Sequence, residues 1–264
     1  MFDLQNLMVC LIEPSRTQRL IIQNHLREMG IENIDLLETG TQGLERMREL
    51  PRPDITISAM YLPDMTGAEL VVTMRADGEI RDMPYVLISS ETRAQQLDAI
   101  RQAGALAILP KPFTTLQLDR ALCSALDYLN TEETRAELEH YDLDTKRVLL
   151  VDDSSTSRHY LRTVLERMGF DQIEEAANGM SAIPLLQETQ FDLIITDYNM
   201  PEMDGRALIE YVRTLSPQMS VPILMVSGEQ DETRLAAVEE AGVSAICDKP
   251  FEISTLRSLI VQFL

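Results

Sequence analysis

DLIITDYNMPEMDG at 192–205 lies over DITISAMYLPDMTG at 54–67, at an offset of 138 positions. Other pairs of segments show the same relation at an offset of 138 or 139: 13–19 with 152–158, 29–30 with 168–169, 103–104 with 241–242, and 111–113 with 249–251. A drift of one residue over more than a hundred positions indicates that the chain contains a duplicated domain.

Each copy alternates apolar strands with amphipathic helices. In the second copy the expected strands are KRVLLVDD, DQIEEA, DLIITD, PILMVS and SAICD. Helices fit between and after them, including the segments around 180–188, 205–215, 231–241 and 252–264. Alternating strands and helices predict an α/β fold whose parallel sheet is covered by helices on both faces.

The helix that follows KRVLLVDD has recognisable ends. Ser155 or Thr156 can cap its N-terminus, and Gly169 can end it. Its expected inward stripe consists of Leu161, Val164, Leu165 and Met168. Proline is tolerated near the first turn of a helix, so Pro184 predicts a displaced start for the helix around 180–188.

Residues 129–146 connect the two copies and are polar, glycine-free and rich in Glu. We interpret them as a helical linker that extends the last helix of the first copy and ends in a hinge near Asp142–Asp144. The predicted domains are therefore 1–128 and 147–264.

Charge and composition exclude several classes of partner. The formal net charge is −20 and the sequence pI is about 4.5, so the chain repels the phosphates of nucleic acids and anionic lipids. No apolar run approaches the roughly 18–20 residues of a membrane span, and the N-terminus lacks the basic start of a signal peptide. Three scattered cysteines suit neither a disulfide framework nor a metal site, and Cys10 and Cys247 are expected as buried thiols. We expect a cytoplasmic protein with neither nucleic acid nor membrane as a partner.

Three acidic residues follow apolar strands in the second copy: Asp152, Asp153 and Asp197. In an open α/β sheet the reactive crevice lies beyond the carboxyl ends of the strands. Gathering carboxylates there costs about 1–4 kcal/mol per pair at a separation of ~4 Å. A hard cation such as Mg²⁺ relieves this repulsion, so the pattern predicts a magnesium site.

With Ser227 at the end of the fourth strand and Lys249–Pro250 after the fifth, residues 146–264 resemble the receiver domain of two-component response regulators. The family resemblance implies a flavodoxin-like (βα)5 doubly wound domain with strand order 2-1-3-4-5. It implies that Asp197 is the phosphoacceptor and that Lys249 and Ser227 contact the phosphoryl group. It also implies that Mg²⁺ (or Mn²⁺) is held by Asp152, Asp153, Asp197 and the backbone carbonyl of Asn199.

Three positions refine the resemblance, which extends to the single-domain chemotaxis regulators. The family often has an aromatic residue three positions before the lysine, and here it is Ile246, which argues against coupling by aromatic rotation and leaves a shift of Ser227. Asn199 and Glu229 resemble the pair found in fast-resetting members, which implies a phosphorylated lifetime of seconds to minutes. Retention of the phosphoryl group for many hours on purified protein would contradict that expectation.

The first copy lacks the reactive groups. Ala59 stands at the acceptor position, and Glu13–Pro14 replaces the acidic pair, although Ser89 and Lys111 remain. Ser58 is adjacent to the acceptor position, but strand alternation points it away. The resemblance therefore implies an inactive pseudo-receiver that serves in docking, dimerisation or regulation, unless it only supports folding. The family's usual contact surface corresponds to 92–103, 105–109 and 114–128.

The expected function is that of a response regulator with no enzymatic activity beyond its own phosphorylation and dephosphorylation at Asp197. Its expected partners are a sensor histidine kinase or phosphotransfer protein, an unidentified downstream protein and, as an option, a second copy of the chain. Two alternatives remain open: a receiver module of a larger enzyme such as a diguanylate cyclase, and a phosphate sink. His25, His140 and His159 lack the helical-bundle setting of a phosphotransfer histidine.

Overall fold

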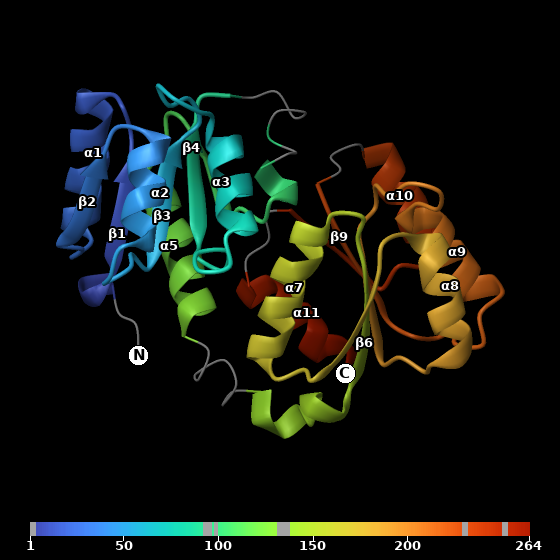
Figure 1. Ribbon diagram of the computed structural model, residues 1–264. Coiled ribbons are helices and arrows are strands. Elements are labelled where there is room, and N and C mark those ends of the chain that lie inside the picture. Colours follow the sequence, from blue (N-terminus) through green and yellow to red (C-terminus); the bar gives the residue numbers. More distant parts are fainter. Residues whose placement is uncertain (1–3, 92–96, 98–99, 131–137, 229–231, 250–252) are drawn as a thin grey trace. The chain divides into compact units, whose positions relative to one another are not determined.

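The computed structural model describes residues 4–91, 97, 100–130, 138–228, 232–249 and 253–264 (Figure 1). The chain separates into two compact units, unit 1 at Met1–Asn130 and unit 2 at Thr131–Leu264. The division falls inside the segment 129–146 that the sequence marks as a linker.

Unit 1 is built from short strands that alternate with helices. Its strands are β1 (Met8–Ile12), β2 (Asn33–Leu37), β3 (Ile55–Ala59), β4 (Tyr85–Ser89) and β5 (Ala107–Pro110). Its described helices are the 3-10 helix η1 (Leu4–Asn6) and the α-helices α1 (Arg16–Glu28), α2 (Gly40–Arg48), α3 (Gly67–Ala76) and α5 (Thr115–Leu129).

Unit 2 repeats the same order. Its strands are β6 (Arg147–Val151), β7 (Gln172–Ala176), β8 (Leu193–Thr196), β9 (Ile223–Ser227) and β10 (Ala245–Asp248). Its α-helices are α7 (Ser155–Met168), α8 (Gly179–Glu188), α9 (Gly205–Thr214), α10 (Glu232–Ala241) and α11 (Ile253–Phe263). Two 3-10 helices, η2 (Glu139–Tyr141) and η3 (Leu143–Thr145), precede β6.

Each unit contains one five-stranded sheet whose strands all pair in parallel. The order is β2-β1-β3-β4-β5 in unit 1 and β10-β9-β8-β6-β7 in unit 2, which is the same order read from the opposite edge. The predicted α/β fold with strand order 2-1-3-4-5 is therefore confirmed in both copies. Strand β1 pairs with β2 on one side and with β3 on the other, so the chain crosses the sheet in opposite directions on the two sides of β1. Because such crossovers are right-handed, the helices lie on both faces of the sheet.

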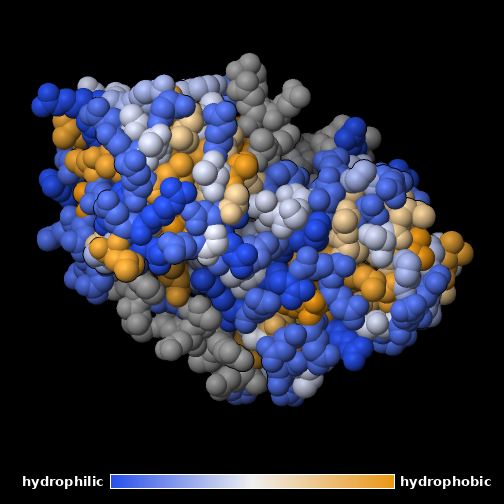
Figure 2. All heavy atoms as spheres, viewed as in Figure 1, coloured by the Kyte–Doolittle hydropathy of each residue, from blue (hydrophilic) through white to orange (hydrophobic). Residues whose placement is uncertain are grey.

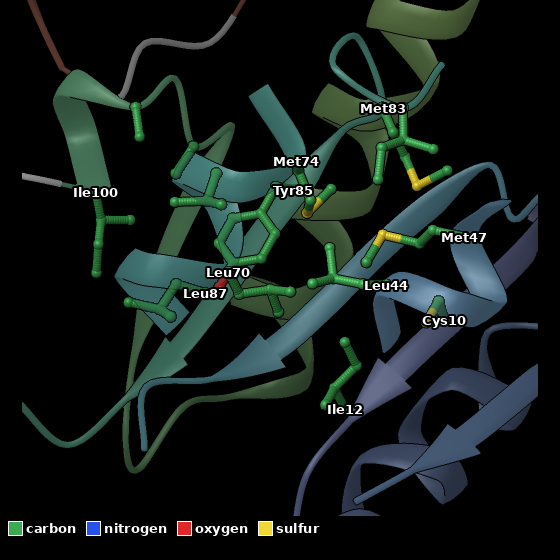
Figure 3. Packing of buried hydrophobic residues seen from close by; sticks show 14 of the residues in the cluster. Cys10, Ile12, Leu44, Met47, Leu70, Met74, Met83, Tyr85, Leu87 and Ile100 are labelled. Atoms are coloured by element: carbon green, nitrogen blue, oxygen red, sulfur yellow. The ribbon is translucent and has the colours of Figure 1, made fainter. Parts of the chain in front are cut away.

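The core of unit 1 on one face of the sheet lies under α2 and α3. Met47 of α2 and Met74 of α3 belong to a buried cluster that includes Cys10 and Tyr85 from the strands (Figure 3). Tyr85 is fully buried, and its hydroxyl donates to the carbonyl of Gly67 at 3.0 Å. Burial raises the pKa of the Cys10 thiol to about 12. Both cysteines expected as buried thiols, Cys10 and Cys247, are buried, whereas Cys123 is exposed.

The ends of α7 agree with the sequence analysis at the C-terminus and correct it at the N-terminus. Gly169 ends the helix in the left-handed region, at φ 110°. The N-cap, however, is Ser154 rather than Ser155 or Thr156, and its hydroxyl accepts from the Ser157 N–H. The four residues of the predicted inward stripe are all buried: Leu161, Val164, Leu165 and Met168.

The prediction of a displaced start for α8 is wrong. The helix begins at Gly179, so Pro184 is its sixth residue. Asn178 and Ser181 fix this start as a capping box. The Ser181 N–H donates to the Asn178 side chain, and the Asn178 N–H donates to the Ser181 hydroxyl. This cap holds the helix start although Pro184 lacks the N–H that would bond the carbonyl one turn earlier.

The start of the linker differs from the predicted helical extension. Helix α5 ends at Leu129 with Asn130 as its C-cap, so it does not continue through Asn130 as one helix. Residues 131–137 of the expected extension lie outside the described residues. Near the expected hinge, η2 and η3 are separated by Asp142, which has φ 48°. Leu143 of η3 is buried.

In both units an arginine near the end of a helix, α3 in unit 1 and α9 in unit 2, donates hydrogen bonds to backbone carbonyls of nearby loops. In unit 2, Arg213 Nε donates to the Gly242 carbonyl, and Nη1 donates to the carbonyls of Met219 and Val221, all at 2.8 Å. Arg75 makes the equivalent contacts in unit 1, with the carbonyls of Gly104, Arg81 and Met83 among its acceptors. The arginine thus satisfies backbone carbonyls that precede β9 and β10.

We expect Arg213→Met to destabilise unit 2 by about 2–4 kcal/mol, because it leaves partly buried carbonyls without their charged donor. Hydrogen exchange measured by mass spectrometry should show faster exchange in β9 and β10. The matched control is Arg206→Met, since the Arg206 side chain is exposed and pairs with Glu210 one turn away at 3.0 Å. Equal effects of the two variants would contradict the assigned role of Arg213.

The visible face of the surface is mostly hydrophilic, with apolar side chains gathered in several separate patches (Figure 2). Leu50 and Leu215 are among the exposed apolar residues. No helix within the described part of the chain is long and apolar enough to span a membrane.

Candidate functional site

The strand register in unit 2 brings two of the predicted acids side by side. Val151 at the end of β6 pairs with Thr196 at the end of β8, and the next residues are Asp152 and Asp197. The Asp197 N–H donates to the Val151 carbonyl at 2.8 Å, which extends the pairing to the acidic residue itself. Both acids therefore lie at the carboxyl edge of the sheet, where the sequence predicts a crevice.

Lys249 connects these two acids. It directly follows β10, and its N–H donates to the Ser227 carbonyl at the end of β9. Its Nζ lies 2.7 Å from Asp152 Oδ2 and 3.2 Å from Asp197 Oδ1. Burial lowers the pKa of the Lys249 ammonium, but the charges of Asp197 and Asp152 outweigh burial and hold that pKa above its usual value.

The Asp197 side chain is buried at this edge of the sheet. Burial raises the pKa of its carboxyl to about 6, against the opposing charge of Lys249. Its Oδ2 atom is buried and has no hydrogen-bond partner among the described residues. A buried carboxylate oxygen without a partner is costly, so this atom is suited to an incoming ligand or reactant.

Asp152, Asp153 and Asp197 form a group that fits a divalent cation. Each offers a carboxylate oxygen, and these oxygens lie within 4.8 Å of one another. Asp152 and Asp197 are buried, whereas Asp153 is exposed. Hard oxygen donors, a net negative charge and one solvent-facing side match the preference of Mg²⁺ for a few carboxylates together with water.

The backbone of Asp197 is held by the start of α9. The Gly205 N–H donates to the Tyr198 carbonyl at 2.9 Å. A Cβ atom on Gly205 would lie 2.2 Å from the Asp197 carbonyl oxygen, so only glycine allows this approach. In unit 1 a Cβ on Gly67 would lie 2.9 Å from the Ala59 carbonyl oxygen, which shows that the close approach belongs to both copies.

Two residues of the site, Ser157 and Arg158, were not predicted from the sequence. Ser157, on the first turn of α7, donates to Asp152 Oδ2 at 2.6 Å and accepts from Lys249 Nζ at 3.1 Å. Arg158 donates from Nη1 to the Asp152 carbonyl. The repeat carried a signal for the arginine, because Arg19 occupies the same position and donates to the Glu13 carbonyl at 2.8 Å. Position 157 carried no such signal, since the repeat has Gln18 there.

The remaining predicted residues are placed as follows. Ser227 is the last residue of β9 and is buried. Asn199, two residues after Asp197, has an exposed side chain. Ile246 is partly buried and packs against the core cluster of unit 2. Glu229 and Pro250 lie outside the described residues.

The same edge of unit 1 has a different arrangement. Glu13 is buried, and its carboxylate accepts from Lys111 Nζ at 2.8 Å and from the Ser15 N–H at 2.9 Å. Ala59, the last residue of β3, occupies the position that Asp197 occupies in unit 2. The Ser58 hydroxyl is buried and donates to the Ala59 carbonyl at 2.9 Å. This edge therefore keeps a lysine–carboxylate pair and has no carboxylate at the acceptor position.

The fold, the acidic group and the buried lysine define a class of signalling domain. The family model described as the response regulator receiver domain matches residues 9–123 and again residues 148–261. The chain belongs to the response regulator receiver family and contains two of its domains in tandem.

The chain is similar to several chemotaxis proteins over one domain's length. Chemotaxis protein CheY-3 of Vibrio cholerae is 35% identical over 111 residues, which are 42% of this chain and 85% of that protein. Chemotaxis protein CheY of Pseudomonas aeruginosa is 36% identical over 114 residues, 43% of this chain and 92% of that protein. The solved structure of Vibrio cholerae chemotaxis protein CheY4 is 34% identical, covers 45% of this chain and 98% of its own, and has a TM-score of 0.42.

Proposed function

We propose that unit 2 is the switch of a response regulator, in which Asp197 accepts a phosphoryl group from a histidine kinase or a phosphotransfer protein. The single observation that carries this proposal is the state of the Asp197 side chain. One of its oxygens is held by Lys249, and the other is buried and has no hydrogen-bond partner in the part of the chain that the structure describes. Receiver domains are typically signalling modules rather than enzymes, so the output would be a change in protein contacts.

The reaction would require a divalent cation at the acidic group. Asp152, Asp153, Asp197 and the backbone carbonyl of Asn199 would hold Mg²⁺ or Mn²⁺, as the family resemblance implies. Bound there, the cation would offset the negative charge that builds up on the phosphoryl oxygens.

The residues of the chain would perform the transfer itself. An Asp197 carboxylate oxygen forms the bond to phosphorus, while the bond from phosphorus to the donor's histidine nitrogen breaks and its electron pair stays on that nitrogen. Lys249 Nζ already lies 3.2 Å from Asp197 Oδ1, so a small shift places it against a phosphoryl oxygen. The Ser227 hydroxyl would donate to another phosphoryl oxygen. The shift of Ser227 toward the phosphoryl group would pass the signal to the chain that follows β9.

Unit 1 would contribute a surface instead of a reaction. With Ala59 at the acceptor position it has no nucleophile there, while its Glu13–Lys111 pair preserves the charge balance of the edge. We propose that unit 1, residues 1–128, serves as a docking, dimerisation or regulatory module for the phosphorylatable domain at 147–264.

The test is to locate the phosphoryl group on the intact chain. The protein is incubated with phosphoramidate and Mg²⁺, with and without excess chelator, and modified peptides are identified by mass spectrometry after borohydride trapping. We expect modification at Asp197, dependence on Mg²⁺, and no modification in unit 1.

The control variant is Asp248→Ala, because Asp248 is an exposed acid at the end of β10, which is separated from β8 by β9. This variant should react as the wild-type chain does. Modification that persists in the presence of chelator, or that lies at Ser58 or elsewhere in unit 1, would overturn the proposal.

A further inference from the structure

Ser157 contacts two charged groups of the site, although it is neither one of the grouped acids nor one of the residues proposed to bind phosphoryl. Its hydroxyl donates to Asp152 Oδ2 at 2.6 Å and accepts from Lys249 Nζ at 3.1 Å. Only 4% of the residue is exposed. A buried hydroxyl that is both donor and acceptor between an acid and its lysine fixes the geometry of that pair.

The start of α7 explains why this hydroxyl can turn inward. In four other helices the third residue accepts from the N-cap N–H and so completes a capping box: Gln42 in α2, Glu69 in α3, Gln117 in α5 and Ser181 in α8. In α7 the N–H of the N-cap Ser154 donates to Asp152 Oδ1 instead. Because Asp152 already satisfies that N–H, the Ser157 side chain is released from capping and reaches the site.

Unit 1 shares this release from capping, since the N–H of the N-cap Ser15 donates to Glu13 Oε1 at 2.9 Å, but it lacks the inward hydroxyl. Gln18 occupies the position of Ser157, and the equivalent lysine, Lys111, donates to Glu13 at 2.8 Å. The Lys111 side chain is 24% exposed, whereas that of Lys249 is 4% exposed. The inward hydroxyl thus accompanies the more enclosed lysine in the copy that has an acceptor aspartate.

We propose that Ser157 is a positioning residue for phosphoryl transfer, which holds the Asp152 carboxylate toward the cation and the Lys249 ammonium toward the phosphoryl group. The inference rests on the proposed function of Asp197. Lys249 has three N–H donors, and its present acceptors are on Asp152, Asp197 and Ser157. When Asp197 forms its bond to phosphorus, the donor aimed at Asp197 turns to a phosphoryl oxygen. Asp152 and Ser157 keep the ammonium in place during that exchange.

The experiment compares full-length wild-type protein with Ser157→Ala, Ser157→Cys and Ser157→Thr. Cysteine keeps the size of serine but is a weak donor, and threonine keeps the hydroxyl. Mn²⁺ affinity is measured by the loss of the free-ion signal in electron paramagnetic resonance. The phosphorylation rate with phosphoramidate is then measured at saturating Mn²⁺, and far-ultraviolet circular dichroism verifies folding.

We expect Mn²⁺ affinity to fall about tenfold in the Ala and Cys variants, as it does when a residue that orients a metal ligand is lost. Their phosphorylation rate at saturating Mn²⁺ should also fall, whereas the Thr variant should remain within about twofold of wild type on both measures. Wild-type behaviour in the Cys variant would show that volume suffices and would overturn the proposal, as would a Thr variant as impaired as Ala. If wild type itself takes no phosphoryl group at Asp197, the proposed function fails instead.

Discussion

The Asp197→Asn chain is expected to take up phosphoryl about a thousandfold more slowly than wild type, or not at all, because the amide is not a nucleophile. The same variant should be more stable than wild type at pH 8 without divalent cations. Burial raises the pKa of the Asp197 carboxyl to about 6, so the folded protein bears the cost of keeping that group ionised above this pH.

The pH dependence follows from the direction of this shift. A folded-state pKa above the unfolded value of about 4 favours the folded state at low pH, and the advantage is lost as the pH rises through about 6. A pKa difference of about two corresponds to about 3 kcal/mol, which the asparagine variant avoids. The stability difference between variant and wild type should therefore narrow as the pH is lowered from 8 to 5.

Urea unfolding, resolved for unit 2 by hydrogen exchange and mass spectrometry, measures this difference. Addition of Mg²⁺ should stabilise wild type and leave the variant nearly unchanged, because only the wild-type acidic group is complete. The control Asp248→Asn removes an exposed carboxylate and should show neither effect. Equal stability of wild type and Asp197→Asn at pH 8 would show that burial of this carboxylate costs little.

Gly205→Ala is expected to destabilise unit 2 by about 2–4 kcal/mol and to slow phosphorylation together with it. The added Cβ would lie 2.2 Å from the Asp197 carbonyl oxygen, which is backbone and cannot rotate away. Either α9 or the end of β8 must move, and both movements displace the acceptor. Hydrogen exchange in peptides from β8 and α9 should report the loss.

The control for this variant is Gly78→Ala, because a Cβ on Gly78 meets nothing within 4 Å. That variant should retain the exchange pattern and the phosphorylation rate of wild type. A Gly205→Ala chain that phosphorylates at the wild-type rate would mean that the close approach is not required to place Asp197.

Much of the fold was predictable because it depends on the internal repeat and on the order of apolar and polar segments. The repeat offset gave two domains, and buried apolar runs such as DLIITD became strands with every residue of β8 buried. Details that depend on local competition were not predictable. Ser154, Ser155 and Thr156 are all acceptable caps by type, and the choice among them follows from where the chain leaves β6. The start of α8 was mispredicted because its cap outweighs the effect of Pro184.

The site shows the same division. Acids that directly follow strands could be placed together from sequence, because the strand register fixes their neighbours. Ser157 could not, since its role depends on which acceptor takes the Ser154 N–H, a detail of three-dimensional geometry. The raised pKa of Asp197 likewise follows from burial, which the motif alone does not specify.

Ala59, at the acceptor position of unit 1, has a consequence for the number of signalling states that the chain can adopt. Two complete receivers would give four phosphorylation states, but a chain with one acceptor has two. Under the proposed function, a partner that touches both units would meet one variable surface and one constant surface. The constant surface would set the baseline affinity, and the variable one would supply the whole of the response.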